Sequence, residues 1–177
     1  MTTYVALLRG INVSGRRIVP MRALREMAEG MGLDAVRTYI QSGNLIFASD
    51  LDQGALAEAL TVEIQKRFGF AVDVALRSGT ELDQAIAQCP FDYGDPKAIH
   101  LGFFVRQPQP GRIADLEDTI PEGRDAVVFS DHHVYINYQD GVHGSPLSNA
   151  FFERQLGVPV TLRNLNTVRT LRTMVDG

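Results

Sequence analysis

Residues 37–47 constrain the fold more than any other part of the chain, because they predict a β-hairpin. Two short runs, 36–40 and 45–48, are rich in β-forming residues, and the polar residues Gln41-Ser42-Gly43-Asn44 lie between them. Glycine and asparagine tolerate the positive φ of a tight turn, so this pattern predicts a Gly-Asn turn that joins two antiparallel strands.

The segments around the hairpin predict the rest of a first domain. The apolar run 4–8 indicates a strand buried on both faces, and 71–76 indicates another strand. Apolar residues recur at helical spacing from Pro20 to Met31 and again from Asp52 to Phe68. The resulting order is β-α-β-β-α-β, which is typical of a ferredoxin-like fold. Right-handed crossovers place its first and third strands in the middle of an antiparallel sheet.

The same order is predicted a second time, without a residue-level repeat. The expected elements are a strand at 99–105, a helix at 113–120, a hairpin of 126–129 with 134–138, a helix at 147–156 and a strand at 158–162. Additional helices are expected at 78–87, beginning with a capping box, and at 164–175. The prediction is therefore an α+β protein with two tandem ferredoxin-like units. The expected domains are 1–78 and 98–177, joined by a helix and linker at 79–97, with the linker proper at 91–97.

Composition limits the classes of partner and compartment. The formal net charge of the 177 residues is -4, which disfavours nonspecific binding to nucleic acid. Cys89 is the only cysteine, so no intramolecular disulfide can form, which favours the reducing cytoplasm. The apolar run near the N-terminus is too short for a signal peptide, and no run approaches the length of a membrane span. We therefore expect no membrane partner.

Three motifs connect the chain with a known family. They are Leu7-Leu-Arg-Gly-Ile-Asn-Val13, Arg37-Thr-Tyr-Ile-Gln-Ser-Gly-Asn44 and Arg163-Asn-Leu-Asn-Thr-Val168. Together with Phe68-Gly-Phe70 and Leu156-Gly-Val-Pro159, they resemble the bacterial family catalogued as domain of unknown function 1697. Two positions depart from the family pattern: Ser14 stands where a second glycine is usual, and Leu165 stands where tryptophan is favoured. The resemblance implies two ferredoxin-like units and no particular activity.

The predicted sheet brings one set of polar residues together. The end of the first strand, the hairpin turn and the start of the strand after it meet at one edge, so we expect Arg9, Asn12, Gln41, Ser42 and Asn44 to be neighbours. Such a site suits an anionic ligand. The alternative is a flexible loop with ordinary turn chemistry. A P-loop is rejected, because arginines stand where its lysine and hydroxyl residue belong.

A second polar set precedes the last helix. Arg163, Asn164 and Asn166 can form an anion site at a helix N-terminus, or Asn164 can simply cap that helix. If the two domains face each other, both sets line one cleft. The expected partner is then an anionic small molecule, with phosphate-bearing compounds among the candidates.

Other residues give no catalytic signature. His132 and His133 are expected to be exposed hairpin residues, His143 a loop residue and Cys89 a packing residue. No spacing indicates a metal site, a cofactor or a carboxylate pair, so catalytic residues and cofactor stay unknown. Two other functions remain open, namely an enzyme that uses the same cleft and an RNA- or DNA-binding module. The latter has only Tyr4 and Phe47 to offer on the central strands. A purely structural role for all three motifs is also open.

Overall fold

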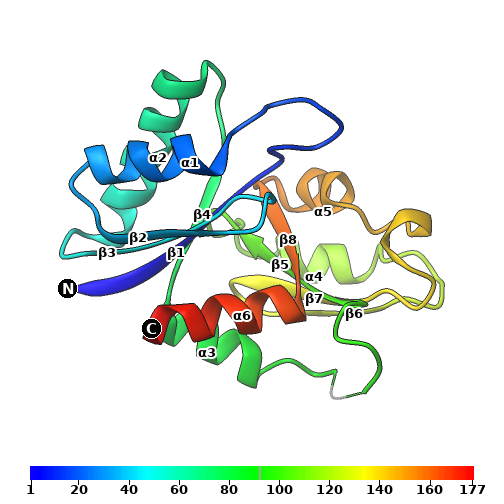
Figure 1. The fold of residues 1–177 in the computed structure, drawn as a ribbon. Coiled ribbons are helices and arrows are strands. Elements are labelled where there is room, and N and C mark those ends of the chain that lie inside the picture. Colours follow the sequence, from blue (N-terminus) through cyan, green and yellow to red (C-terminus); the bar gives the residue numbers. More distant parts are fainter. Residues whose placement is uncertain (92) are drawn as a thin grey trace. The chain divides into compact units, whose positions relative to one another are not determined.

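The computed structural model describes residues 1–91 and 93–177, and its elements run twice through strand, helix, strand, strand, helix, strand (Figure 1). The first series is β1 (Thr2–Leu8), α1 (Met21–Gly30), β2 (Asp34–Tyr39), β3 (Asn44–Ser49), α2 (Gln53–Phe68) and β4 (Val74–Ser78), followed by α3 (Gly79–Ala87). The second is β5 (Ile99–Phe104), α4 (Arg112–Glu117), β6 (Ala126–Phe129), β7 (His133–Asn137), η1 (Val142–Gly144), α5 (Asn149–Leu156) and β8 (Val160–Asn164), followed by α6 (Leu165–Asp176).

The strands form two four-stranded antiparallel sheets. Their orders are β2-β3-β1-β4 and β6-β7-β5-β8. The α+β class is therefore confirmed. In each sheet the first and third strands of the series are central, as the crossover rule predicts.

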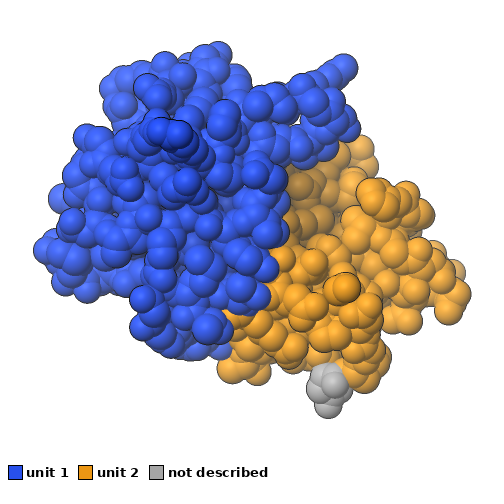
Figure 2. All heavy atoms as spheres, in the orientation of Figure 1, with its two compact units in different colours: residues 1–83, 170–177 blue, residues 84–169 orange. Residues whose placement is uncertain are grey.

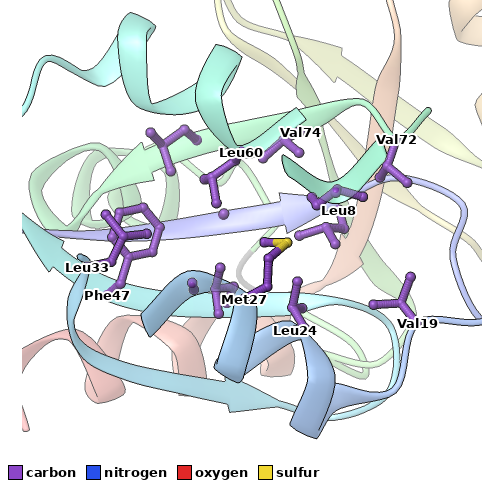
Figure 3. Close-up of a cluster of buried hydrophobic side chains, with 14 of the residues drawn as sticks. Leu8, Val19, Leu24, Met27, Leu33, Phe47, Leu60, Val72 and Val74 are labelled. Atoms are coloured by element: carbon purple, nitrogen blue, oxygen red, sulfur yellow. The ribbon is translucent and has the colours of Figure 1, made fainter. Parts of the chain in front are cut away.

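The core of the first sheet lies between its strands and helices α1 and α2 (Figure 3). Alternate residues of β1 and β3 point to this face, among them Leu8 and Phe47, where they meet Leu24 of α1 and Leu60 of α2. The residues of β1 between them are buried as well: Val5 and Leu7 have no exposed surface. The apolar run 4–8 is thus buried on both faces, as its lack of alternation predicts.

The N-termini of helices α2 and α3 are capped by the residues that the sequence predicts. The Asp52 carboxylate accepts hydrogen bonds from the amides of Gly54 and Ala55 and so caps α2. At the start of α3, Ser78 N–H donates to the Glu81 carboxylate at 2.7 Å, and Glu81 N–H donates back to Ser78 Oγ at 3.3 Å. This reciprocal pair is the predicted capping box.

Two compact units can be distinguished by their internal contacts, and Figure 2 colours them separately. One consists of residues 1–83 with 170–177, and the other of residues 84–169. The last residues of α6 therefore belong with the first unit. Arg172 donates to both carboxylate oxygens of Asp83, at 2.6 and 2.8 Å, and the Arg37 guanidinium donates to the Met174 carbonyl. These contacts hold the C-terminus to a unit that begins at residue 1.

The Arg172–Asp83 pair makes stability depend on pH. Hydrogen bonds from Arg172 hold the pKa of the Asp83 carboxyl below its ordinary value. A depressed carboxyl pKa contributes stability above the unfolded pKa of about 4, and this contribution disappears as the pH falls through the folded pKa. Urea unfolding should therefore show that Asp83→Asn is less stable than wild type near neutral pH and that the difference shrinks below about pH 4. Glu58→Gln, which alters an exposed carboxylate on α2, is the control. A difference that stays constant with pH would contradict the pair's role.

The second unit buries an aromatic core between its sheet and α5. Phe151 and Phe152 of α5 pack with Phe104, Val134 and Leu116. The helix begins two residues later than predicted, at Asn149, because the Ser148 hydroxyl caps it by accepting from Phe151 N–H at 3.3 Å.

Several other predicted boundaries were wrong. Strand β4 begins at Val74 rather than residue 71, and β8 begins at Val160 rather than residue 158. Helix α4 ends at Glu117 instead of residue 120. Before β4, the Ala71 and Asp73 carbonyls accept hydrogen bonds from Arg17 and Arg9. This segment therefore binds the loop that follows β1.

The predicted linker, residues 91–97, includes Asp92, which lies outside the described residues. Of its described part, Asp95 makes a turn: its carboxylate accepts from Lys97 N–H and its carbonyl from Ala98 N–H. Within the described ranges, none of the helices combines the length and the apolar character needed to cross a bilayer.

Candidate functional site

The first polar set does gather at one edge of the first sheet. Leu8 N–H, at the end of β1, donates to the Gly43 carbonyl at 2.8 Å, and Leu7 lies opposite Asn44 in the ladder. Asn12, in the loop after β1, donates through Nδ2 to the Gln41 carbonyl at 2.8 Å. The end of β1, the following loop and the hairpin turn are therefore joined directly, as the strand order requires.

Asn12 holds this edge together. Its Oδ1 accepts from Val19 N–H at 2.8 Å, and its Nδ2 donates to the Val19 carbonyl at 3.0 Å as well as to the Gln41 carbonyl. These bonds close the loop of residues 9–19 on itself and tie it to the turn. The Asn12 side chain therefore positions its neighbours, because its amide group is already engaged.

The hairpin turn differs from the predicted Gly-Asn turn. Tyr39 and Asn44 are paired in the ladder, so the loop is Ile40–Gly43, and the positive φ values belong to Ile40 (48°) and Gly43 (84°). Asn44 begins β3 and is fully buried. Its Nδ2 donates to the Tyr39 carbonyl at 2.9 Å and to Ser42 Oγ at 3.1 Å. Asn44 thus braces the turn, and Gln41 and Ser42 are exposed.

Three arginines give this edge its charge. The Arg9 guanidinium lies 3.9 Å from the Asp73 carboxylate, and the Arg9 backbone N–H donates to the Asp73 carbonyl. Arg17 donates to the Ala71 carbonyl and lies over the Phe70 ring, 5.4 Å from its centre. Arg16 is exposed. We call Arg9, Arg16, Arg17 and Asp73 the basic edge.

The sequence did not identify Asp73, Phe70 or Ala71 as part of this site. The Arg17–Ala71 hydrogen bond joins residues 54 positions apart, and no local pattern marks either partner. The fact that β4 pairs with β1 was the one available signal, because it predicts that the start of β4 lies beside the end of β1.

The loop of the basic edge is conformationally strained. Asn12, Ser14 and Arg17 all have positive φ, between 50° and 54°. Non-glycine residues rarely adopt this region, and such strain persists only where the surroundings enforce it. Here the Asn12 and Arg17 side-chain bonds enforce it. These bonds favour an ordered loop over the flexible alternative.

The second polar set belongs to the other unit, and only its arginine is buried. Arg163 lies in β8 with 7% of its surface exposed, and it donates to Thr161 Oγ1 at 2.8 Å and to the Leu162 carbonyl at 2.9 Å. Burial lowers the pKa of its guanidinium to about 10. Asn164 Oδ1 accepts from Thr167 N–H at 2.8 Å, so Asn164 caps α6, and Asn166 is exposed.

The two hairpin histidines differ from the expectation that both are exposed. His132 is exposed, but His133 is buried, with Nε2 2.6 Å from the Tyr135 hydroxyl. Tyr135 in turn donates to the Ala85 carbonyl at 2.7 Å. Burial raises the pKa of the Tyr135 phenol, so this hydroxyl stays a donor. The prediction for His133 was wrong because both faces of β7 are buried, so neither face directs a side chain to solvent.

The aromatic residues of the RNA-binding alternative are buried. Tyr4 and Phe47 lie in the core beneath α1 and α2 with ring centres 6.0 Å apart, so they cannot stack on RNA bases. Cys89 is half-buried with Sγ 3.8 Å from the Phe91 carbonyl. His143 is exposed in η1. Among the described residues, no three His, Cys, Asp or Glu side chains are grouped to hold a metal ion.

Comparison with known proteins agrees with the fold. A family model described as "Protein of unknown function (DUF1697)" matches residues 1–135. Among solved structures, the chain is similar to the conserved bacterial protein SP0830 from Streptococcus pneumoniae, with 24% sequence identity and a TM-score of 0.80. The similarity covers 100% of this chain and 99% of that one. No curated protein matches the sequence.

Proposed function

We propose that this chain, which belongs to the DUF1697 family of proteins of unknown function, binds a small anionic ligand at the basic edge of its first unit. One observation carries the proposal. Three arginines lie on the anchored loop of residues 9–19, and Asp73 lies 3.9 Å from one of them, Arg9, in a protein whose net charge is -4. A local excess of positive charge against the overall charge favours an anionic ligand.

The arginines differ in what they can offer. Arg17 is committed to the Ala71 carbonyl and the Phe70 ring, so it contributes charge from a fixed position. Arg9 has 27% of its side chain exposed and lies 3.9 Å from the Asp73 carboxylate. Arg16 is exposed. Arg9 and Arg16 are therefore the guanidiniums that donate to phosphate or carboxylate oxygens.

The neutral residues have separate roles in this proposal. Gln41 and Ser42 are exposed in the turn, so they can add directional hydrogen bonds to the ligand. Asn12 and Asn44 fix the loop and the turn through the bonds described above. We assign the last two to positioning rather than to direct ligand contact.

The second polar set extends the proposal. Arg163, Asn164 and Asn166 are proposed as further ligand-binding residues of the second unit. A buried guanidinium is a strong partner for an anion, since its charge is poorly solvated. Asn164 would contribute through Nδ2, because its Oδ1 is engaged in capping α6.

The finer features of the fold and setting are also proposals. The strand orders support assigning both units to the ferredoxin-like type. We propose that 1–78 and 98–177 are two domains joined by 79–97, with residues 170–177 packed against the first, and limited proteolysis would test the boundary. The single cysteine supports a cytoplasmic location.

A thermal-shift screen of wild type, Arg9→Ala and Arg16→Ala tests the binding proposal. The panel contains inorganic phosphate, nucleotides, sugar phosphates, dicarboxylates and short RNA. A ligand present at about a hundred times its dissociation constant should raise the free energy of unfolding by about 2.7 kcal/mol. We expect a saturable rise for a small anion in wild type and a smaller rise in both variants.

Arg22→Ala is the matched control, because Arg22 is an exposed arginine of α1 in the same unit. It should keep the wild-type response. A response that is equal in all four proteins would place the site elsewhere. A panel without any response would refute the proposal, and binding of RNA alone with a steep salt dependence would favour the nucleic-acid alternative.

A further inference from the structure

The outer strand of the second sheet is open along one side. Strand β6 is at the end of the order β6-β7-β5-β8 and pairs only with β7. Ser130 N–H donates to the His133 carbonyl, so this position is a hydrogen-bonded pair of the ladder. Hydrogen-bonded pairs alternate with non-bonded ones in antiparallel strands, so the N–H and C=O groups of Val127 and Phe129 point away from β7.

Among the described residues of the second unit, no hydrogen bond to these outward backbone groups of Val127 and Phe129 is found. The next carbonyl in the same row, that of Asp131, accepts from Gln107 Nε2 at 2.7 Å. The protein thus occupies one end of the row with its own side chain and leaves the middle open.

This edge also lacks the charges that usually protect one. Charged residues occur within the other three edge strands: Asp34 and Arg37 in β2, Arg77 in β4 and Arg163 in β8. The sequence of β6 is Ala-Val-Val-Phe, and Val128 is 41% exposed. Charges within edge strands prevent pairing with other chains, so an edge without them is suited to accept a further strand.

A groove lies beside the open edge. It has a volume of about 360 Å³, and its lining includes Phe129 and Asp131, the α4 residues Ile113 and Glu117, and Pro110 of the preceding loop. A strand added to β6 would project alternate side chains toward this groove. The apolar residues of its mixed lining suit an aliphatic side chain, and the carboxylates of Glu117 and Asp131 suit a basic residue.

From these observations we propose that β6 and this groove bind an extended segment of a partner protein, which adds a strand to the sheet and carries aliphatic residues flanked by lysine or arginine. The charges select this occupant. Residues 106–131 contain six acidic and three basic residues. In a twofold pairing of β6 with a second copy, Asp125 of one chain would approach Asp131 of the other, so like charges oppose self-association.

Binding of a fluorescent, end-blocked Lys-Val-Thr-Val-Lys peptide to the full-length protein tests this inference. Two further peptides carry backbone N-methyl groups, one on the central threonine and the other on both valines. An added strand directs only alternate N–H groups to β6, so one methylated peptide should bind at least about tenfold more weakly and the other nearly as well as the parent. The peptide with glutamate in place of both lysines should also bind about tenfold more weakly.

Variants of the protein locate the site. Glu117→Lys should weaken binding of the lysine peptide and strengthen binding of the glutamate peptide. Glu58→Lys, which makes the same charge change on α2 of the first unit, should do neither. Val127→Pro removes an outward N–H without breaking the β6–β7 ladder and should abolish binding. Circular dichroism identifies loss of fold in that variant, and the peptide series decides the matter if it unfolds.

Three results would overturn the inference. They are no binding at millimolar peptide, equal binding of the two N-methylated peptides, or a response of Glu58→Lys as large as that of Glu117→Lys. Sedimentation that shows a dimer of the wild type, lost in Val127→Pro, would identify a second copy as the occupant instead.

Discussion

Gly43→Ala should lower the free energy of unfolding by about 3 kcal/mol and loosen the basic edge. A Cβ atom at this position would lie 2.6 Å from Ile11 Cδ1 and 2.9 Å from Leu8 Cβ. Such overpacking costs about 1–3 kcal/mol, and the φ of +84° adds about 1 kcal/mol for any residue with a side chain. Urea unfolding followed by circular dichroism measures the change, because the chain has no tryptophan.

Gly69→Ala is the control for the backbone contribution alone. Gly69 has nearly the same φ, +83°, but an added Cβ would meet no atom within 4 Å. This variant should therefore lose only about 1 kcal/mol. Equal losses in the two variants would show that the turn does not press against Ile11 and Leu8. If Gly43→Ala also weakens anion binding while Gly69→Ala does not, the turn and the loop act as one site.

Phe47→Ala should have the largest effect on stability, about 3–5 kcal/mol, without acting on any binding surface. Phe47 of β3 is fully buried in the core that the first sheet forms with α1 and α2 (Figure 3). Its ring centre lies 6.0 Å from that of Tyr4. Removal of a buried aromatic ring loses its transfer free energy and leaves a cavity that the surrounding side chains fill only in part. The loss should appear as a lower urea midpoint for the first unit.

Val62→Ala provides the comparison: Val62 is a residue of α2 that is 44% exposed, so its truncation should change stability by less than about 0.5 kcal/mol. A Phe47→Ala protein of wild-type stability that fails to bind RNA would contradict the core assignment and revive the stacking alternative. The same two variants therefore separate packing from recognition on the central strands.

The two proposed sites are independent of each other. The basic edge and the adjacent hairpin turn belong to the first unit. The β6 groove belongs to the second unit and consists of unpaired backbone groups and carboxylates. An anion that stabilises the wild type should not compete with the lysine peptide. Failure of one proposal leaves the other standing, since they share no residue.

The loop after β1 and the hairpin turn lie side by side because of the strand order, which the sequence predicts correctly. Apolar runs and helical spacing indicate the order of elements, and the crossover rule then makes β1 and β3 central. Once β1 lies between β3 and β4, the loop after β1 must meet the hairpin turn. Asn12 and Gln41 were predicted neighbours for this reason, although they are 29 positions apart.

The use of each side chain could not be predicted in the same way. Asn44 looked like a turn residue, but its pairing with both Leu7 and Tyr39 makes it a buried strand residue. His133 looked exposed, but both faces of β7 are buried and its ring lies against Tyr135. Residue type records hydrogen-bonding capacity, whereas the partner that uses it depends on packing between segments distant in sequence.

The sequence by itself determined the elements, their order and the central strands, because hydrophobic period, capping and turn chemistry act within a few residues. Only the tertiary structure decided that Arg17 donates a hydrogen bond to the Ala71 carbonyl and that the end of α6 belongs with residues 1–83. It also decided that β6 has an open edge beside a groove. Those outcomes depend on contacts between distant segments, whose energies become favourable only after the chain has folded.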